Sequence, residues 1–295
     1  MLAPLSVDTN SINCLRSVEL GGAHELTTAD HEEVLSFLGT HTLHTGYLTG
    51  LVRDHGIVSP NNRGTFYGYR DSSQQLEGVA LIGHAIVMEA KTDQALKAFA
   101  AAAQRCTTAH LILCEENRMD QFWRLYAQGG QEMRRASRQL QFELRWPTEV
   151  TNARSGLRLA ALQDLEQLIP VHAEMAREES GVDPMVVDPI GFVQRYTKRI
   201  EKGRTWVSMI NGKLIFKAEV INESPGVTYI EGVWVNPELR RQGYGLGCMS
   251  QLSRMLLWRT KSLCLLVNDE NEAAARFVKQ AGYHLRGVYD TIFLK

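Results

Sequence analysis

Residues 229–257 read YIEGVWVNPELRRQGYGLGCMSQLSRMLL, and this stretch decides which fold is expected. Its first part alternates as a β-strand does, and one face of that strand carries Tyr229, Glu231, Val233 and Val235. Pro237 ends the strand. From Leu246 onward, apolar residues recur at the spacing of an amphipathic helix. The predicted order is therefore a strand, a basic glycine turn and a helix.

The turn between the strand and the helix reads Arg240-x-x-Gly243-x-Gly245. A helix start offers unpaired backbone N–H groups and the positive end of the helix dipole, and glycine lets a ligand come close to that backbone. The turn therefore suits a phosphate group, with a purely structural turn as the alternative. It is not a Walker loop, because it lacks Gly-Lys-Ser/Thr. It is not a dinucleotide fingerprint either, because the third glycine and the downstream acid are missing.

A second segment follows the helix. Residues 263–267 read as a buried strand, residues 272–281 read as a helix, and Gly282 ends that helix as a C-cap glycine does. With the V-x-V-x-P run at 233–237, the glycine turn resembles the acyl-CoA binding motif of the GNAT N-acetyltransferase superfamily. That superfamily also has a second motif, V-x-x-x-N-x-x-A-x-x-x-Tyr with a closing Gly-Phe. The matching residues here are Val267, Asn271, Ala274 and the pair Gly282-Tyr283.

The resemblance covers residues 157–295 and implies an N-acyltransferase that uses acetyl-CoA as cosubstrate and needs no metal. It implies that Asn271 holds the pantetheine or thioester end, and that backbone groups of two valines bind the pantetheine arm. The basic turn would cradle the pyrophosphate. The cofactor-binding residues implied in this way are Val233, Val235, Arg240, Arg241, Gln242, Gly243, Tyr244, Gly245, Leu246 and Asn271.

The chemistry of acyl transfer asks for a base and an acid. An alkylammonium with a pKa of ~10 is mostly charged at neutral pH, so a base must remove its proton. Glu231 is the catalytic candidate, because it lies two residues before Val233 on the same strand face and some members of the superfamily carry a base on this strand. The alternative is a glutamate with a structural partner. A backbone N–H near Val235 could polarise the thioester carbonyl.

The acid is missing from its usual place. Val278 stands where the superfamily has a tyrosine, and it cannot donate a proton. Tyr283 and Tyr289 are near in sequence, and both are interpreted as core aromatics. A coenzyme thiol leaves readily, so water could serve instead. The expected function is transfer of acetyl from acetyl-CoA to an amine by direct attack, and the alternative is a noncatalytic acyl-CoA-binding sensor or regulatory protein.

Composition sets the remaining expectations. The net charge of -1 argues against a nucleic-acid partner, and the absence of a long apolar run or a signal-peptide pattern argues for a cytoplasmic protein without a membrane partner. The five cysteines have no Cys-x-x-Cys spacing, so free thiols are favoured over disulfides or zinc. The acceptor is expected to be a small-molecule or peptide amine, and the oligomeric state does not follow from the sequence.

The two halves of the chain read alike. LILCEEN, which ends at Asn117, aligns with LLVNDEN, which ends at Asn271, and the helices after them also align. We therefore predict an internal duplication, with domains at 1–150 and 151–295 and a linker at 147–156. Each domain is expected to be α/β (α+β), with a mixed, mostly antiparallel twisted sheet that is flanked by helices and ends in a strand pair. The first domain has no glycine turn, so it is interpreted as a degenerate copy that supports the other or shapes the acceptor site.

Three polar clusters have alternative interpretations. His41 and His44 are three residues apart, but they have no cysteine or carboxylate at matching spacing, so packing or capping is favoured over a metal site. For the basic side chains at 134–138, a solvated strand edge is favoured over an anion patch: Arg134, Arg135 and Arg138. The third cluster could attract a cationic amine or could be a solvated loop face: Glu178, Glu179, Asp183 and Asp188.

Overall fold

The computed structural model describes residues 22–148 and 156–295. Most of the predicted linker and the boundary at residue 150 lie outside the described residues. The secondary structure repeats. Each half runs strand, two helices, three strands, helix, strand, helix, strand, and the second half adds one short helix. This repeat agrees with the predicted duplication, and the mixed α/β architecture with a mostly antiparallel sheet agrees with the predicted fold class.

The elements of the first half are β1 (Ala23–Glu25), α1 (His31–Leu38), α2 (Thr42–His55), β2 (Gly64–Arg70), β3 (Leu76–Gly83), β4 (Ala85–Ala90), α3 (Asp93–Ala103), β5 (Leu111–Glu115), α4 (Glu116–Tyr126) and β6 (Met133–Leu144). Those of the second half are β7 (Leu157–Leu159), α5 (Leu165–Ser180), α6 (Pro184–Val187), α7 (Pro189–Glu201), β8 (Thr205–Ile210), β9 (Lys213–Glu223), β10 (Thr228–Val235), α8 (Tyr244–Leu257), β11 (Leu263–Asn268), α9 (Glu272–Gln280) and β12 (His284–Leu294).

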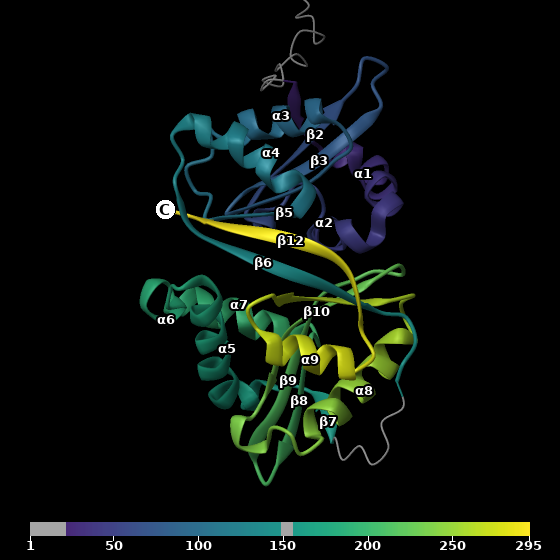
Figure 1. Ribbon diagram of the computed structural model, residues 1–295, viewed down its shortest axis with the longest axis vertical. Coiled ribbons are helices and arrows are strands. Elements are labelled where there is room, and N and C mark those ends of the chain that lie inside the picture. The colour runs from purple at the N-terminus through teal and green to yellow at the C-terminus, as the bar shows by residue number, and fades with distance from the viewer. Residues whose placement is uncertain (1–21, 149–155) are drawn as a thin grey trace, which may run out of the picture.

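All these strands form one twelve-stranded sheet in the order β1-β2-β3-β4-β5-β12-β6-β11-β10-β9-β8-β7. The last strand of each half lies beside strands of the other half, because β12 separates β5 from β6 and β6 separates β12 from β11. In Figure 1, β6 and β12 cross the middle of the molecule, with the helices of the first half on one side and those of the second half on the other. The two halves therefore share one sheet.

Two sequence expectations need correction. Each half ends in one long strand, β6 or β12, and not in a strand pair, because these two strands pair with each other along nearly their whole length. The apolar run GVALIGHAIVMEA at residues 78–90 reads in the sequence as one strand, but it forms two strands, β3 and β4, which meet in an antiparallel hairpin around His84. The chain can turn there because Gly83 packs against the backbone of Gly64. A Cβ atom on Gly83 would lie 2.3 Å from the Cα atom of Gly64.

Helices cover both faces of each half of the sheet. Side chains of α1 and α2 form one buried cluster on β2 and β3, and side chains of α3 and α4 form another with β4 and β5. In the second half, α5 and α7 pack on one face, while α8 and α9 pack on the other. Helix α2 also reaches the second half, where Gly46 and Gly50 bring its backbone against Tyr229 and Asn222. This contact places the first half over the central strands of the second.

The two parallel strand pairs part along their length. β4 pairs with β5 from Ala85 to Val87, and β10 pairs with β11 only at Thr228 and Tyr229. Beyond Tyr229, β10 has register shifts against β9, and Gly232 has a φ of 58°. β-Bulges of this kind bend a strand away from its neighbour. The remainder of β10 therefore diverges from β11 and leaves backbone groups on both strands unpaired with each other.

Candidate active site

The start of α8 is open to a ligand. Gly243 is its N-cap residue with a φ of 85°, and within the described chain no side chain caps this helix. Arg241 also has a positive φ, of 62°, and the Nε atom of Arg240 donates to the carbonyl oxygen of Val235 at 3.1 Å. This last contact ties the turn to the end of β10. The first-turn N–H groups of α8 are therefore presented on a turn that is fixed to the diverging strand.

The two glycines of the turn have different physical roles. A Cβ atom on Gly243 would meet nothing within 4 Å, so glycine is needed there for the left-handed backbone conformation and not for space. A Cβ atom on Gly245 would lie 2.8 Å from Cγ2 of Val235 and 3.0 Å from Cε2 of Phe277. Gly245 thus lets α8 begin directly against β10 and α9. The open space in front of Gly243 is where an anion could lie.

A cavity of about 1480 Å³ opens where the parallel strands part. Its wall includes the diverging parts of β10 and β11 and the start of α9. It also includes residues of α5 between His172 and Glu179, and residues of α2 from the first half. It also extends into the opening between β4 and β5. A typical ligand pocket holds roughly 300–1,000 Å³, so this cavity has room for more than one bound group.

The predicted site residues divide into two groups. Glu231, Val233 and Asn271 line the cavity. Val235 and the turn from Arg240 to Leu246 lie outside its wall, but a Cβ atom on Gly245 would lie 3.0 Å from Phe277, which does line it. Asn271 is also the N-cap of α9, and its Oδ1 atom accepts from the N–H of Ala274 at 3.0 Å. The predicted pyrophosphate turn thus lies at the start of α8, and the residue predicted to hold the thioester end lies at the start of α9.

Glu231 is tied to a buried charge network. Its Oε1 atom accepts from Nη1 of Arg199 at 2.6 Å, and its side chain is 40% exposed. The same Nη1 atom of Arg199 donates to Glu219 on β9, which also forms an ion pair with the buried Lys217. Burial opposes ionisation of Glu219, but the positive charges of Lys217 and Arg199 outweigh it and hold the pKa of that carboxyl below its usual value.

Two more groups of the cavity wall lie near Glu231. His172 on α5 is half-buried and stacks against Phe192 and Tyr196, and its partial burial lowers its pKa to about 4, so the ring is neutral at neutral pH. Glu179, on the same helix, is reached by solvent inside the cavity but is surrounded by protein. This enclosure, together with the negative charge of Glu231, raises the pKa of Glu179.

The hydroxyl groups near the site are mostly engaged. Tyr283 is buried with its hydroxyl 3.2 Å from Oγ of Ser253, as expected of a core aromatic. Tyr289 is likewise buried with a satisfied hydroxyl, as predicted, and this hydroxyl lies 2.7 Å from Nδ1 of His44; its side chain also lines the cavity. The hydroxyl of Tyr229 donates to the carbonyl oxygen of Leu43. Val278 is buried with 3% exposure, so its position offers no proton donor.

The first half has a matching opening without a phosphate turn. Glu89 lies two residues beyond Val87, the last residue of β4 that pairs with β5, just as Glu231 lies two beyond Tyr229. Helix α3, however, is capped by Thr92, whose Oγ1 atom accepts from the N–H of Ala95. Asp93 in its first turn forms an ion pair with Arg118 at 2.7 Å. The helix start that would face a phosphate therefore carries the protein's own carboxylate.

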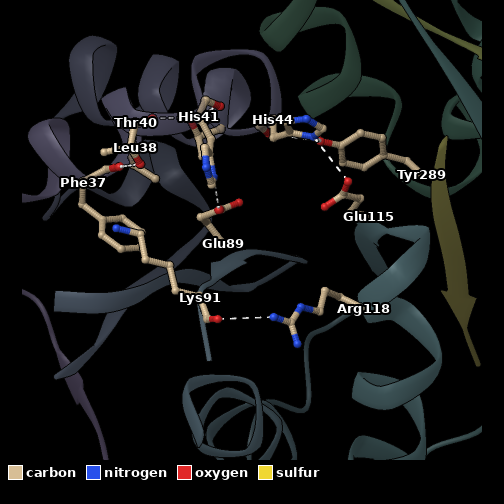
Figure 2. Close-up of polar contacts among 11 residues, drawn as sticks. Phe37, Leu38, Thr40, His41, His44, Glu89, Lys91, Glu115, Arg118 and Tyr289 are labelled. Carbon is tan, nitrogen blue, oxygen red and sulfur yellow. Dashed lines mark hydrogen bonds and ion pairs between the residues drawn. The ribbon is translucent and has the colours of Figure 1, made fainter. Parts of the chain in front are cut away.

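Figure 2 shows how polar side chains line this first opening. His41 lies 2.9 Å from Glu89, and His44 faces Tyr289 with Glu115 at 3.9 Å. Across the opening, Arg118 donates to the carbonyl oxygen of Lys91 at 3.3 Å. In the described residues no group of three or more histidine, cysteine or carboxylate side chains is placed to hold a metal ion. His41 is the N-cap residue of α2, but its side chain does not cap the helix, and both histidine rings are engaged in side-chain contacts.

The other two polar clusters, the arginines at 134–138 and the acidic residues at 178–188, also have defined contacts. Arg134 and Arg135 donate to carbonyl oxygens at the end of α5, and Arg138 forms ion pairs with Glu116 and Asp290. The expected solvated strand edge agrees with the structure, because Arg134 and Arg138 are exposed and residues 133–138 of β6 pair with β12 on one side only, since β11 begins to pair with β6 at Gln139. Of the acidic cluster, Glu178 and Glu179 line the cavity. Asp183 and Asp188 cap α6 and α7.

The four cysteines among the described residues are free, and Cys14 lies outside them. Three functional candidates were not predicted: Arg199, His172 and the pair Lys217–Glu219. A signal existed only for the pair. A lysine and a glutamate two residues apart in the apolar run LIFKAEVI must share one buried face, and buried charges need partners. Arg199 and His172 lie on helices, and their partners follow from packing.

Comparisons with known proteins agree with this geometry. Residues 170–283 match the family described as acetyltransferase (GNAT) family. A Drosophila protein of known structure superimposes with a TM-score of 0.68 at 12% identity, over 93% of this chain and 98% of that one. A GNAT-family acetyltransferase from Colwellia psychrerythraea gives a TM-score of 0.52 at 12% identity, over 92% and 99%.

A tandem GNAT protein from the clavulanic acid biosynthesis pathway also superimposes, with a TM-score of 0.52 at 12% identity over 91% of this chain and 97% of that one. At these identities the likeness establishes the fold alone. No curated protein matches the sequence. Among the described helices, none is long and apolar enough to cross a membrane.

Proposed function

Residues 170–283 form a GNAT acetyltransferase domain, and from this premise we propose that the protein transfers an acyl group, in the first place acetyl, from acyl-CoA to an amine. The observation that carries the proposal is the divergence of β10 from β11 beside the uncapped start of α8. An extended pantetheine arm needs an open strand edge, and a diphosphate needs convergent N–H donors. The open edge of β10 and the start of α8 are joined by the short segment between Val235 and Tyr244.

Each part of the site has a role in this reaction. The N–H groups from Gln242 to Leu246, with Arg240 and Arg241, would hold the pyrophosphate. The backbone of Val233 and Val235 would hold the arm, and Asn271 would lie at its thioester end. Glu231 would take the proton of the attacking amine, directly or through water. The thiolate would leave with a proton from water, since Val278 offers none. The acceptor would be a small-molecule or peptide amine, and the reaction would take place in the cytoplasm.

One variant tests the cofactor site. Gly243→Asp should abolish measurable acetyl-CoA binding in isothermal titration calorimetry, because it places a carboxylate in the open space before α8 and strains a backbone with a φ of 85°. Gly130→Asp is the matched control. Gly130 has a φ of 87° and also has nothing near its missing Cβ, but it lies in the first half. Equal affinity in the two variants would refute the site.

A noncatalytic acyl-CoA-binding sensor is the second candidate, and the buried Val278 in the tyrosine position favours it. The two functions differ in turnover. A panel of amines and peptides incubated with acetyl-CoA should yield free thiol above the hydrolysis background with at least one acceptor. Tight acetyl-CoA binding without thiol release across the panel would support the sensor instead.

A further inference from the structure

Two opposite charges are buried in β9, the strand that pairs with β10, which carries Glu231. The side chains of Lys217 and Glu219 are completely buried, and they form an ion pair. A buried ion pair stabilises a fold less than well-packed apolar side chains of the same volume. The pair therefore calls for a role beyond stability.

The carboxylate of Glu219 is saturated with donors. Its Oε1 atom accepts from Lys217 and from the hydroxyl of Tyr196 at 3.1 Å, and Nδ1 of His172 lies 3.4 Å away. Its Oε2 atom accepts from Arg199. With a lysine, an arginine and a tyrosine hydroxyl directed at it, this carboxylate has a fixed position. It provides a rigid anchor in the middle of the sheet.

Arg199 connects this anchor to the proposed base. Glu219 and Glu231 are register partners on β9 and β10, so two like charges lie opposite each other across the strands. Such an arrangement is unfavourable unless a cation lies between them. Nη1 of Arg199 fills that place and donates to both carboxylates, to Glu231 at 2.6 Å. Arg199 thereby defines where the Glu231 carboxylate lies.

The bulge in β10 rests on the same group. Gly232 has a φ of 58°, and a Cβ atom on it would lie 3.0 Å from Nζ of Lys217 and 3.1 Å from Oε1 of Glu219. The strand thus leaves its regular path directly over the buried pair, one residue after Glu231. The network therefore supports the carboxylate and the backbone that carries it.

We propose that Arg199 is a positioning residue that orients Glu231 toward the cavity, with the Lys217–Glu219 pair as its anchor. This inference rests on the proposed acyl transfer and deepens it. Arg199 does not need to touch the substrate. A misplacement of about 1 Å in a catalytic group can lower a rate by about 10²-fold, so the loss of one bridging donor should be measurable.

A double-mutant cycle in the full chain tests the proposal. Arg199→Lys keeps a positive charge that can pair with Glu219. The lysine side chain is shorter, however, so its ammonium group cannot donate to both carboxylates in the same geometry. We expect kcat to fall by about tenfold or more, with the acetyl-CoA KM changed by less than about twofold. In the Glu231→Gln background the same substitution should cause no further loss, because its effect passes through Glu231.

The contrary result is equally defined. If Arg199→Lys lowers kcat by the same factor with and without Glu231, or leaves kcat unchanged, Arg199 does not position that carboxylate. Arg195→Lys on the same helix is the matched control, because Arg195 pairs with the exposed Asp188. Failure of the wild-type protein to release thiol would refute the proposed function. Wild-type turnover with an additive cycle would refute only the role of Arg199.

A second variant decides the question if Arg199→Lys does not fold. Glu231→Asp leaves the buried anchor intact and withdraws the carboxylate from Arg199 by one methylene group. The proposal requires a loss in kcat close to that of Glu231→Gln, with the melting temperature near that of the wild type. Full activity of Glu231→Asp would overturn it, since a carboxylate that works away from Arg199 needs no positioning by it.

Discussion

Glu231 lies at the point where the strand bulge, the cavity and the charge network meet. If it is the base, Glu231→Gln should lower kcat by about 10²-fold or more near neutral pH, because the amide cannot accept the proton of the ammonium. The dissociation constant for acetyl-CoA should stay unchanged. Glu132→Gln, which removes only an exposed ion pair with Lys295, is the control for the assay. An unaltered kcat would exclude Glu231 as the base.

His84 links protonation to stability. Burial lowers its pKa to about 4, with a further contribution from Arg63, whereas an unfolded histidine has a pKa near 6.5. The unfolded chain therefore binds more protons between these values, so the contribution of His84 to stability is complete above pH 6.5 and is lost as the pH falls toward 4. Allowing for its partial exposure, we expect a loss of about 1 kcal/mol between pH 7.5 and 5.

Urea unfolding of His84→Gln at both pH values would check this expectation. The variant should lose less stability on acidification than the wild type, and His284→Gln, at an exposed position, should behave as the wild type does. An equal pH dependence in all three proteins would show that His84 is not buried as a neutral ring.

The glycine turn, Asn271 and Glu231 could be proposed as site residues from the sequence because their spacing along one chain segment carries the signal. Arg199 could not, because its two partners follow it by 20 and 32 residues and only the packing of α7 on β9 brings them together. Tyr289 is buried as the sequence predicted, but its hydrogen-bond partner could not be predicted for the same reason. Its partner, His44, lies in the other half of the chain, and only the strand exchange makes them neighbours.

At the scale of elements, helix α2 lies unusually close to the sheet. A Cβ atom on Gly50 would come within 2.2 Å of Cγ of Asn222, so Gly50→Ala must push the helix away from β9. We expect a destabilisation of about 1–3 kcal/mol in chemical denaturation. Gly39→Ala is the control, since Gly39 has a helical φ of -64° and open space around it, and it should be neutral or slightly stabilising. A neutral Gly50→Ala would disprove the close contact.

Most helices and short strands were predictable, because hydrophobic periodicity and end signals are local. The break between α1 and α2 falls at Gly39, where a glycine interrupts the helical pattern, and the hairpin between β8 and β9 turns at Asn211-Gly212, a dipeptide that favours such turns. The long strands were not predictable. β6 and β12 continue for eleven or twelve residues because they pair with each other along nearly their whole length, and each belongs to a different half of the chain.

At the scale of the molecule, the exchanged strands make the two halves interdependent. Both sheet neighbours of β12, which are β5 and β6, come from the first half, and β6 is also the second neighbour of β11. Polar contacts cross the same boundary: Arg286 donates to Glu143 at 2.9 Å, and Gln141 donates to the hydroxyl of Tyr229 at 3.0 Å. A first half without a phosphate turn can therefore be retained because it completes the sheet that carries the active site.

This interdependence predicts the behaviour of the separated halves. Residues 156–295 alone should aggregate or remain largely unfolded, because β12 would lack both partners and β11 would expose an unpaired edge. Co-expression with residues 1–148 should restore a soluble one-to-one complex that binds acetyl-CoA as the intact chain does. Size-exclusion chromatography, circular dichroism and calorimetric titration would measure this. A folded, monomeric second half that binds acetyl-CoA by itself would mean that β12 can pair directly with β11, and that the strand exchange is not required for the site.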